Sequence, residues 1–119
     1  MTTTHETMTR ARTKKWDARI TYGGLDEDLS GALGIWFTAR TVPGAATPVF
    51  QKSLGAGITI TNAAQGRAAI IVDPVDTAAL SSNREYGLYY ELAYKNAAGE
   101  VHRIAEGRLT VVPNIADVP

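Results

Sequence analysis

Hydrophobic and polar residues alternate along several segments of this chain, and a period of two is typical of β-strands that bury one face. The clearest segment runs from Tyr86 to Lys95, where every second residue is large and apolar. A helix would scatter these side chains around its axis instead of gathering them on one face. The pattern therefore predicts a strand whose inner face carries Tyr86, Leu88, Tyr90, Leu92 and Tyr94.

Shorter segments elsewhere show the same alternation. In one of them Leu33, Ile35 and Phe37 share the predicted inner face. Two β-branched segments separated by a polar, glycine-containing turn predict a hairpin. The further strands are expected at residues 16–22, 33–40, 49–52, 58–61, 67–72 and 100–112, and the hairpin joins 58–61 to 67–72.

Two local features break the alternation. Ile104 lies on the opposite face from Leu109 and Val111 unless the last strand contains an extra residue, and Gly107 is the expected site of this β-bulge. Residues 73–80 combine a proline with helix formers, so we expect one helical turn there.

About seven short strands with one helical turn predict an all-β fold, an antiparallel immunoglobulin-like β-sandwich. The 119 residues are enough for one ordinary domain. Residues 1–13 contain few apolar side chains to offset the entropy of ordering, so we predict a flexible, polar and basic N-terminal arm. We assign residues 14–112 to the sandwich and residues 113–119 to a C-terminal tail.

The composition of the chain excludes several classes of partner and cofactor from what we expect. Twelve Lys+Arg balance twelve Asp+Glu, so a nucleic-acid partner, which needs a surplus of cations, is not expected. With no cysteine and only two histidines, disulfides, metal sites and cofactors are not expected either. No apolar run approaches the roughly 20 residues that span a bilayer, so we expect a soluble protein without a membrane partner.

Enzymatic chemistry also finds little support. Asp26, Glu27 and Asp28 lack the ligand spacing of a calcium loop, and Asp28 is expected to accept backbone N–H bonds in a turn. Asp73 and Asp76 flank Pro74, where carboxylates cap the start of a helix. Because no acid, base and nucleophile converge in the sequence, we expect no catalytic residues and a protein that is not an enzyme.

Two sets of residues are candidates for partner binding. The first gives the arm and the residues directly after it four positive charges, which suits docking on an acidic partner surface but also a merely solvated tail. The second consists of aromatic residues opposite the inner faces of their strands, which suit binding hot spots but also cross-strand pairs that cover their own sheet. The candidates are Arg10, Arg12, Lys14 and Lys15 in the first set, and Trp36 and Tyr89 in the second.

Several turn and core positions form a recognisable set across residues 16–112. They are Asp28-Leu29-Ser30-Gly31-Ala32, Ile58-Thr59-Ile60 with Gly66, Asp76-Thr77 with Leu80, Tyr86-Gly87-Leu88-Tyr89-Tyr90-Glu91-Leu92, Gly99, and Glu106-Gly107-Arg108-Leu109-Thr110-Val111. Together these segments resemble the N-terminal domain of phage baseplate upper proteins, and the resemblance consists of turns and core positions.

The resemblance implies a non-enzymatic structural protein of a tailed-phage virion, assembled in the host cytoplasm. As a tail or baseplate-type component, it would dock onto other virion structural proteins through its arm, tail and sheet surface, in many copies or as a homo-oligomer. The brevity of the chain leaves capsid decoration as an alternative. An alternative of another class is a carbohydrate- or receptor-binding sandwich with Trp36 and Tyr89 as its platform.

Overall fold

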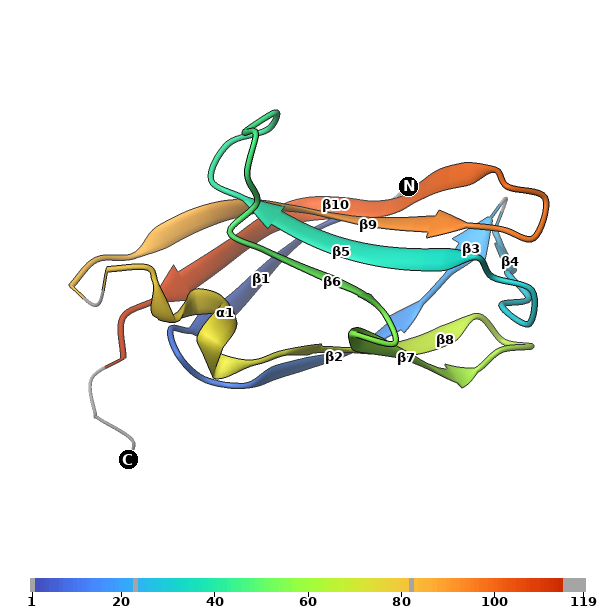
Figure 1. Ribbon diagram of the computed structural model, residues 1–119, viewed down its shortest axis with the longest axis horizontal. Helices are drawn as coiled ribbons and strands as arrows, with labels where there is room; N and C mark the ends of the chain where they lie inside the picture. The colour runs from blue at the N-terminus through green and yellow to red at the C-terminus, as the bar shows by residue number, and fades with distance from the viewer. Residues whose placement is uncertain (1, 23, 82, 115–119) are drawn as a thin grey trace.

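The structure, a computed structural model, describes residues 2–22, 24–81 and 83–114. Its strands form two layers that face each other across one core, with a short helix at one end (Figure 1). In chain order the elements are β1 (Thr2–Thr9), β2 (Lys14–Arg19), β3 (Thr21–Tyr22), β4 (Leu25–Asp26), β5 (Gly34–Arg40), β6 (Phe50–Leu54), β7 (Gly57–Asn62), β8 (Arg67–Val72), α1 (Pro74–Ala78), β9 (Tyr86–Lys95) and β10 (Val101–Val112).

Eight of the strands form one continuous sheet in the order β1-β10-β9-β5-β6-β7-β8-β2, and β3 pairs with β4 in a separate small hairpin. The sheet folds over between β6 and β7, which pair in parallel only at Ser53–Gly57 and Leu54–Ile58. We call β1-β10-β9-β5-β6 the front sheet and β7-β8-β2 the back sheet. All neighbours within them are antiparallel except β1 and β10, which are parallel.

The strand order is that of an immunoglobulin-like sandwich. Strands β5, β9 and β10 lie in the order that the immunoglobulin fold gives its C, F and G strands, and β2, β8 and β7 match B, E and D. The fold's tyrosine corner is present as well, because the Tyr86 hydroxyl accepts a hydrogen bond of 3.0 Å from the Ser81 backbone N–H. The predicted all-β, immunoglobulin-like class is therefore confirmed, with more strands than the seven expected.

The alternation along β9 sets the core. Leu88, Tyr90, Leu92 and Tyr94 are all buried, whereas the residues between them are half-buried on the other side of the sheet. Aromatic rings join the two layers, because Phe37 of β5 lies 5.2 Å from both Tyr90 and Trp16 between ring centroids. Trp16 belongs to the back sheet, so the contact ties β2 to the front sheet.

The predicted flexible arm is wrong for most of its length. Residues Thr2–Thr9 form β1, which pairs in register with residues 105–112 of β10 and places Met8 in the core at 4% exposure. The error has a physical reason: a polar segment can join the edge of a sheet when a long neighbouring strand pairs with it along its whole length and a buried side chain anchors it. Of the predicted tail, residues 115–119 lie outside the described residues.

Two details of the predicted strands also differ. The bulge in β10 exists, but the register shifts between Arg103 and Ala105, at Ile104 instead of Gly107. A bulge requires glycine only where one residue has a positive φ, and Ile104 does not have one. Gly107 remains paired with Tyr90 in the regular ladder. Leu33, expected in the core, is 60% exposed because it lies before the first paired residue of β5.

The predicted helical turn is α1, and a buried cation holds it in place. Lys52 of β6 is 8% exposed, and its Nζ lies 2.6 Å from Asp76 Oδ2 and 3.2 Å from Asp73 Oδ2. As expected, a carboxylate caps the helix start, since Asp76 Oδ2 also accepts the Asp73 N–H at 2.7 Å. Desolvation alone would lower the pKa of Lys52, but the two carboxylates outweigh it and raise that pKa.

Replacing Lys52 by methionine should destabilise the protein by about 3 kcal/mol, because a largely buried carboxylate loses its cation. The wild-type contribution is fully present below the unfolded-state pKa of 10.5 and is lost as pH rises through the higher folded-state pKa. Urea unfolding between neutral and strongly alkaline pH should therefore bring the two proteins closer together in stability. Lys15→Met, on the exposed face of β2, is the matched control; an equal effect of both substitutions would contradict the prediction.

Candidate functional site

The outer face of the front sheet gathers the outward residues of β5, β9 and β10 into rows that cross the strands. The backbone register places Tyr89 between Arg40 and Arg108, and Glu91 between Thr38 and Glu106. The next row contains Trp36, Ala93 and Arg103. Both aromatic residues predicted to point outward therefore do so on one face, four residues apart along neighbouring strands and roughly 13 Å from each other.

Tyr89 is half-buried under an arginine. The Arg108 guanidinium carbon lies 4.1 Å from the centroid of the Tyr89 ring, a cation–π contact across β9 and β10. Gly87 leaves room for this arrangement, because a Cβ at that position would lie 2.6 Å from Arg108 Nη2. The glycine and the stacked ring together hold the guanidinium flat against the sheet.

Trp36 covers its own strand. Its ring occupies the space where a side chain of Gly34 would otherwise project, so Gly34 is buried although it faces outward. This arrangement fixes the ring and leaves Trp36 half-buried. Trp36 is thus partly a cover for the sheet, as one of the two interpretations held, and still presents an aromatic surface to solvent.

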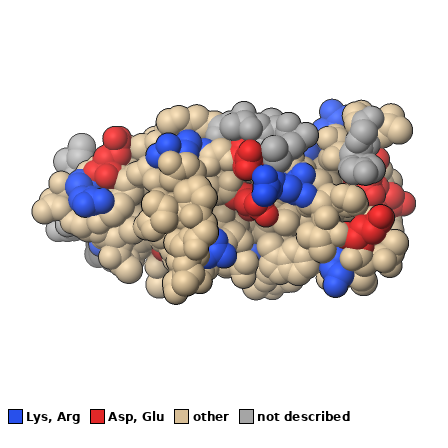
Figure 2. Space-filling view, turned by 90° about the horizontal axis from the view of Figure 1, so that it is seen from above, with Lys and Arg blue, Asp and Glu red and all other residues tan. Residues whose placement is uncertain are grey.

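Between these two aromatic positions lies a charge network. Arg103 Nε is 2.9 Å from Glu91 Oε2, and Arg103 Nη1 is 3.1 Å from Glu106 Oε2. All three side chains are about half exposed, so the ion pairs orient side chains more than they stabilise the fold. Figure 2 looks down on this side of the molecule, where side chains of both signs lie next to one another among uncharged surface.

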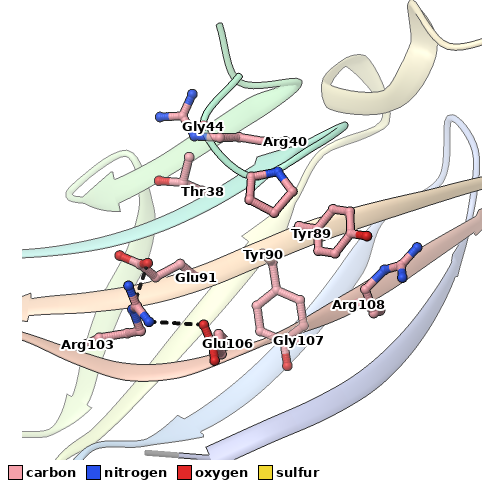
Figure 3. A pocket seen from close by; sticks show the side chains of 11 residues that line it. Thr38, Arg40, Gly44, Tyr89, Tyr90, Glu91, Arg103, Glu106, Gly107 and Arg108 are labelled. Atoms are coloured by element: carbon pink, nitrogen blue, oxygen red, sulfur yellow. Dashed lines mark hydrogen bonds and ion pairs between the residues drawn. The ribbon is translucent and has the colours of Figure 1, made fainter. Parts of the chain in front are cut away.

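A groove of about 660 Å³ opens over these rows. The connection between β5 and β6 forms its side wall through Pro43 and Gly44, and Figure 3 shows Tyr89, Arg108 and the Arg103 network along its floor. Arg40 is tied to that connection, because its Nη1 donates a hydrogen bond of 2.5 Å to the Ala45 carbonyl oxygen. The side chains can thus form a polar groove with an aromatic floor.

The basic residues near the predicted arm do not join this face. Arg10 donates to the carbonyl oxygens of Leu80 at 2.6 Å and Ala78 at 2.5 Å and to Asn114 Oδ1 at 3.0 Å, so it anchors the end of β1 to the α1 region. Arg12 lies in the following turn, where its Nη1 donates to the Ala11 carbonyl. Lys14 and Lys15 belong to β2 in the back sheet, with Lys14 Nζ 5.6 Å from the Trp16 ring centroid.

The acidic loop has a structural role. Asp28 Oδ1 accepts hydrogen bonds from the Ser30 hydroxyl at 2.6 Å and the Ser30 N–H at 2.9 Å, which confirms the predicted turn and lowers the pKa of Asp28. Asp26 instead pairs with Arg19 at 2.6 Å. Within the described ranges, no group of three or more His, Asp or Glu side chains could hold a metal ion. No helix there is long and apolar enough to cross a membrane.

Sequence reasoning missed most of the charged residues around Tyr89. Arg108 precedes the inward Leu109 and could have been placed outward by parity alone. Glu106 could not, because the bulge lies at Ile104 and was expected three residues later, at Gly107, which would have turned Glu106 inward. Arg40 could be assigned to the outer face but not to the row of Tyr89, since strand pairing decides which residues become neighbours.

Comparisons with known proteins do not identify a family or a function for this chain. No family model matches the chain, and no curated protein sequence matches it. Murine CRIg aligns at 9% identity and a TM-score of 0.43 over 92% of each chain. AggA, the major subunit of aggregative adherence fimbriae type I from Escherichia coli, aligns at 16% identity and a TM-score of 0.35 over 94% of this chain and 92% of its own. Alignments this loose carry no argument about function.

Gly34→Ala should push the Trp36 ring off the sheet, because the new methyl group needs the space that the ring occupies. In a Trp16→Phe background, where Trp36 is the remaining tryptophan, the fluorescence emission should move to longer wavelength as the ring enters water. Thr38→Ala, two residues along the same face, should leave the emission in place. Unchanged emission in the Gly34→Ala protein would show that Trp36 does not depend on this space.

Proposed function

We propose that this protein is a non-enzymatic structural component of a tailed-phage particle, of tail or baseplate type, which docks onto other virion proteins through the outer face of its front sheet. The resemblance to the N-terminal domain of phage baseplate upper proteins supports the proposal that the protein is part of a tailed-phage particle. The arrangement of Trp36 and Tyr89 supports the docking surface, and this is the observation on which the proposal depends.

The outer face has the properties of a preformed interface. Aromatic and arginine side chains supply most binding hot spots, and both kinds are held here before any partner arrives. Trp36 lies over Gly34 and Arg108 lies over Gly87 and Tyr89, so little side-chain entropy remains to be lost on binding. The surface therefore suits repeated, specific contact more than chemical turnover.

The position of β1 supports a docking role for the sheet instead of an arm that becomes ordered on binding. Residues 2–9 are already paired with β10, so they do not receive their first backbone partners from a neighbouring protein. The outer side chains of the front sheet are available to a partner without any such ordering. Many copies on a symmetric particle would strengthen a modest contact through effective concentration.

The test uses particles of a tailed phage whose genome encodes this chain. The protein should be found in purified particles in many copies by quantitative mass spectrometry. Labelled protein added to particles that lack it should co-sediment, and the Trp36→Ala/Tyr89→Ala protein should bind at least tenfold more weakly, as expected when hot-spot side chains are truncated.

Thr59→Ala/Ile71→Ala, on the exposed face of the back sheet, is the matched control and should bind like wild type. Circular dichroism of each variant should show that the fold is retained. Absence of the protein from particles, or co-sedimentation unaffected by the front-sheet substitutions, would refute the proposal. Glycan binding that is lost in Trp36→Ala would favour a carbohydrate-binding module instead.

A further inference from the structure

We propose that the row Arg40–Tyr89–Arg108 is a carboxylate-binding site that receives an acidic segment of the partner protein. This inference rests on the proposed docking function and names the chemistry that the docking surface recognises. Its components come from β5, β9 and β10, and each is the direct cross-strand neighbour of the next.

The charges of the groove do not cancel at this row. Arg103 has two carboxylates within ion-pair distance, Glu91 and Glu106. Within the described ranges, by contrast, neither Arg40 nor Arg108 has a carboxylate within 4.0 Å. Two guanidinium groups on either side of Tyr89 are therefore left to be matched by an external anion (Figure 3).

The hydrogen bonds and stacking of the two arginines leave N–H donors available. Arg108 contacts Tyr89 through the face of its guanidinium, and stacking of this kind leaves the edge N–H groups in the plane, where a carboxylate binds in a bidentate manner. Arg40 uses Nη1 for the Ala45 carbonyl, which fixes its direction and leaves other N–H donors on the same group.

The neighbouring row selects against a continuous polyanion. Glu91 and Glu106 lie one row along the strands from Tyr89 and Arg108, roughly 7 Å away along each strand. A nucleic-acid backbone, with a phosphate at every nucleotide, would place some of its charge against these glutamates. An acidic peptide can place carboxylates at the arginine row and neutral or basic residues beside the glutamates.

The distance between the two arginines indicates how far apart the acidic residues of the bound peptide should be. Arg40 and Arg108 project from strands separated by β9, so their backbones are roughly 10 Å apart. Residues i and i+3 of a polyproline-II segment lie on the same side of the chain at a similar distance, because this helix has three residues per turn and rises about 3.1 Å per residue. An acidic sugar fits less well, because the Arg108 guanidinium already covers the Tyr89 ring on which a sugar would stack.

The probe is the hexapeptide acetyl-Gly-Glu-Gly-Ser-Glu-Gly-amide, titrated into ¹⁵N-labelled full-length protein at low salt. Chemical shifts of Arg40, Tyr89 and Arg108 should change in a saturable manner and weaken as salt is added, since exposed charges are screened. The Arg40→Gln/Arg108→Gln protein should bind the peptide at least tenfold more weakly. A second peptide with glutamine in place of glutamate should not bind.

Lys14→Gln/Lys15→Gln removes the same amount of charge from the back sheet and is the matched control, expected to bind the peptide like wild type. No saturable shifts, shifts spread over both sheets, or equal binding by the arginine variant and this control would overturn the inference. Stronger binding of a sulfated oligosaccharide than of the peptide at the same residues would overturn it in favour of an acidic glycan.

Co-sedimentation with particles distinguishes a failure of the carboxylate site from a failure of the proposed docking function. If the arginine variant co-sediments with particles as well as wild type while Trp36→Ala/Tyr89→Ala does not, the docking surface stands and the carboxylate site is wrong. If no variant alters co-sedimentation but the peptide still binds at the row, the site exists without the proposed docking function.

Discussion

The structure depends on β9, whose inner face forms part of the core and whose outer face forms part of the candidate site. The inner residues of β9 pack against the back sheet and against Phe37, and they supply four of the buried side chains of the core. Its outer residues, Tyr89 and Glu91, stand at the centre of the candidate site. Since successive side chains of a strand point in opposite directions, the packing that fixes the core also fixes the direction of the site residues.

Small residues give the outer face its shape. Gly34 and Gly87 provide the space in which Trp36 and Arg108 lie flat, so two large side chains cover the sheet instead of extending into solvent. Arg103 of β10 forms ion pairs with Glu91 of β9 and with Glu106 of its own strand. The outcome is a flat surface whose aromatic and charged groups keep their positions without a partner, which lowers the entropic cost of binding.

Parallel pairing with β10 fixes the N-terminal segment of the chain in the structure. The pairing converts a polar segment into part of the front sheet, and Arg10 then ties it to the carbonyl oxygens around α1. A second tie to the same region comes from Lys52, buried between β6 and the carboxylates of Asp73 and Asp76. The helix therefore connects strands that are far apart in sequence.

The sequence by itself determined the strands with strong alternation, their buried faces, the capped helical turn and the outward direction of Trp36 and Tyr89, because these follow from local periodicity and turn chemistry. Only the tertiary structure decided that residues 2–9 are a strand, that the bulge lies at Ile104, and that Arg40, Tyr89 and Arg108 form one row. Each of these depends on which strands pair and in which register, and pairing joins residues whose separation in sequence leaves no local pattern to reveal it.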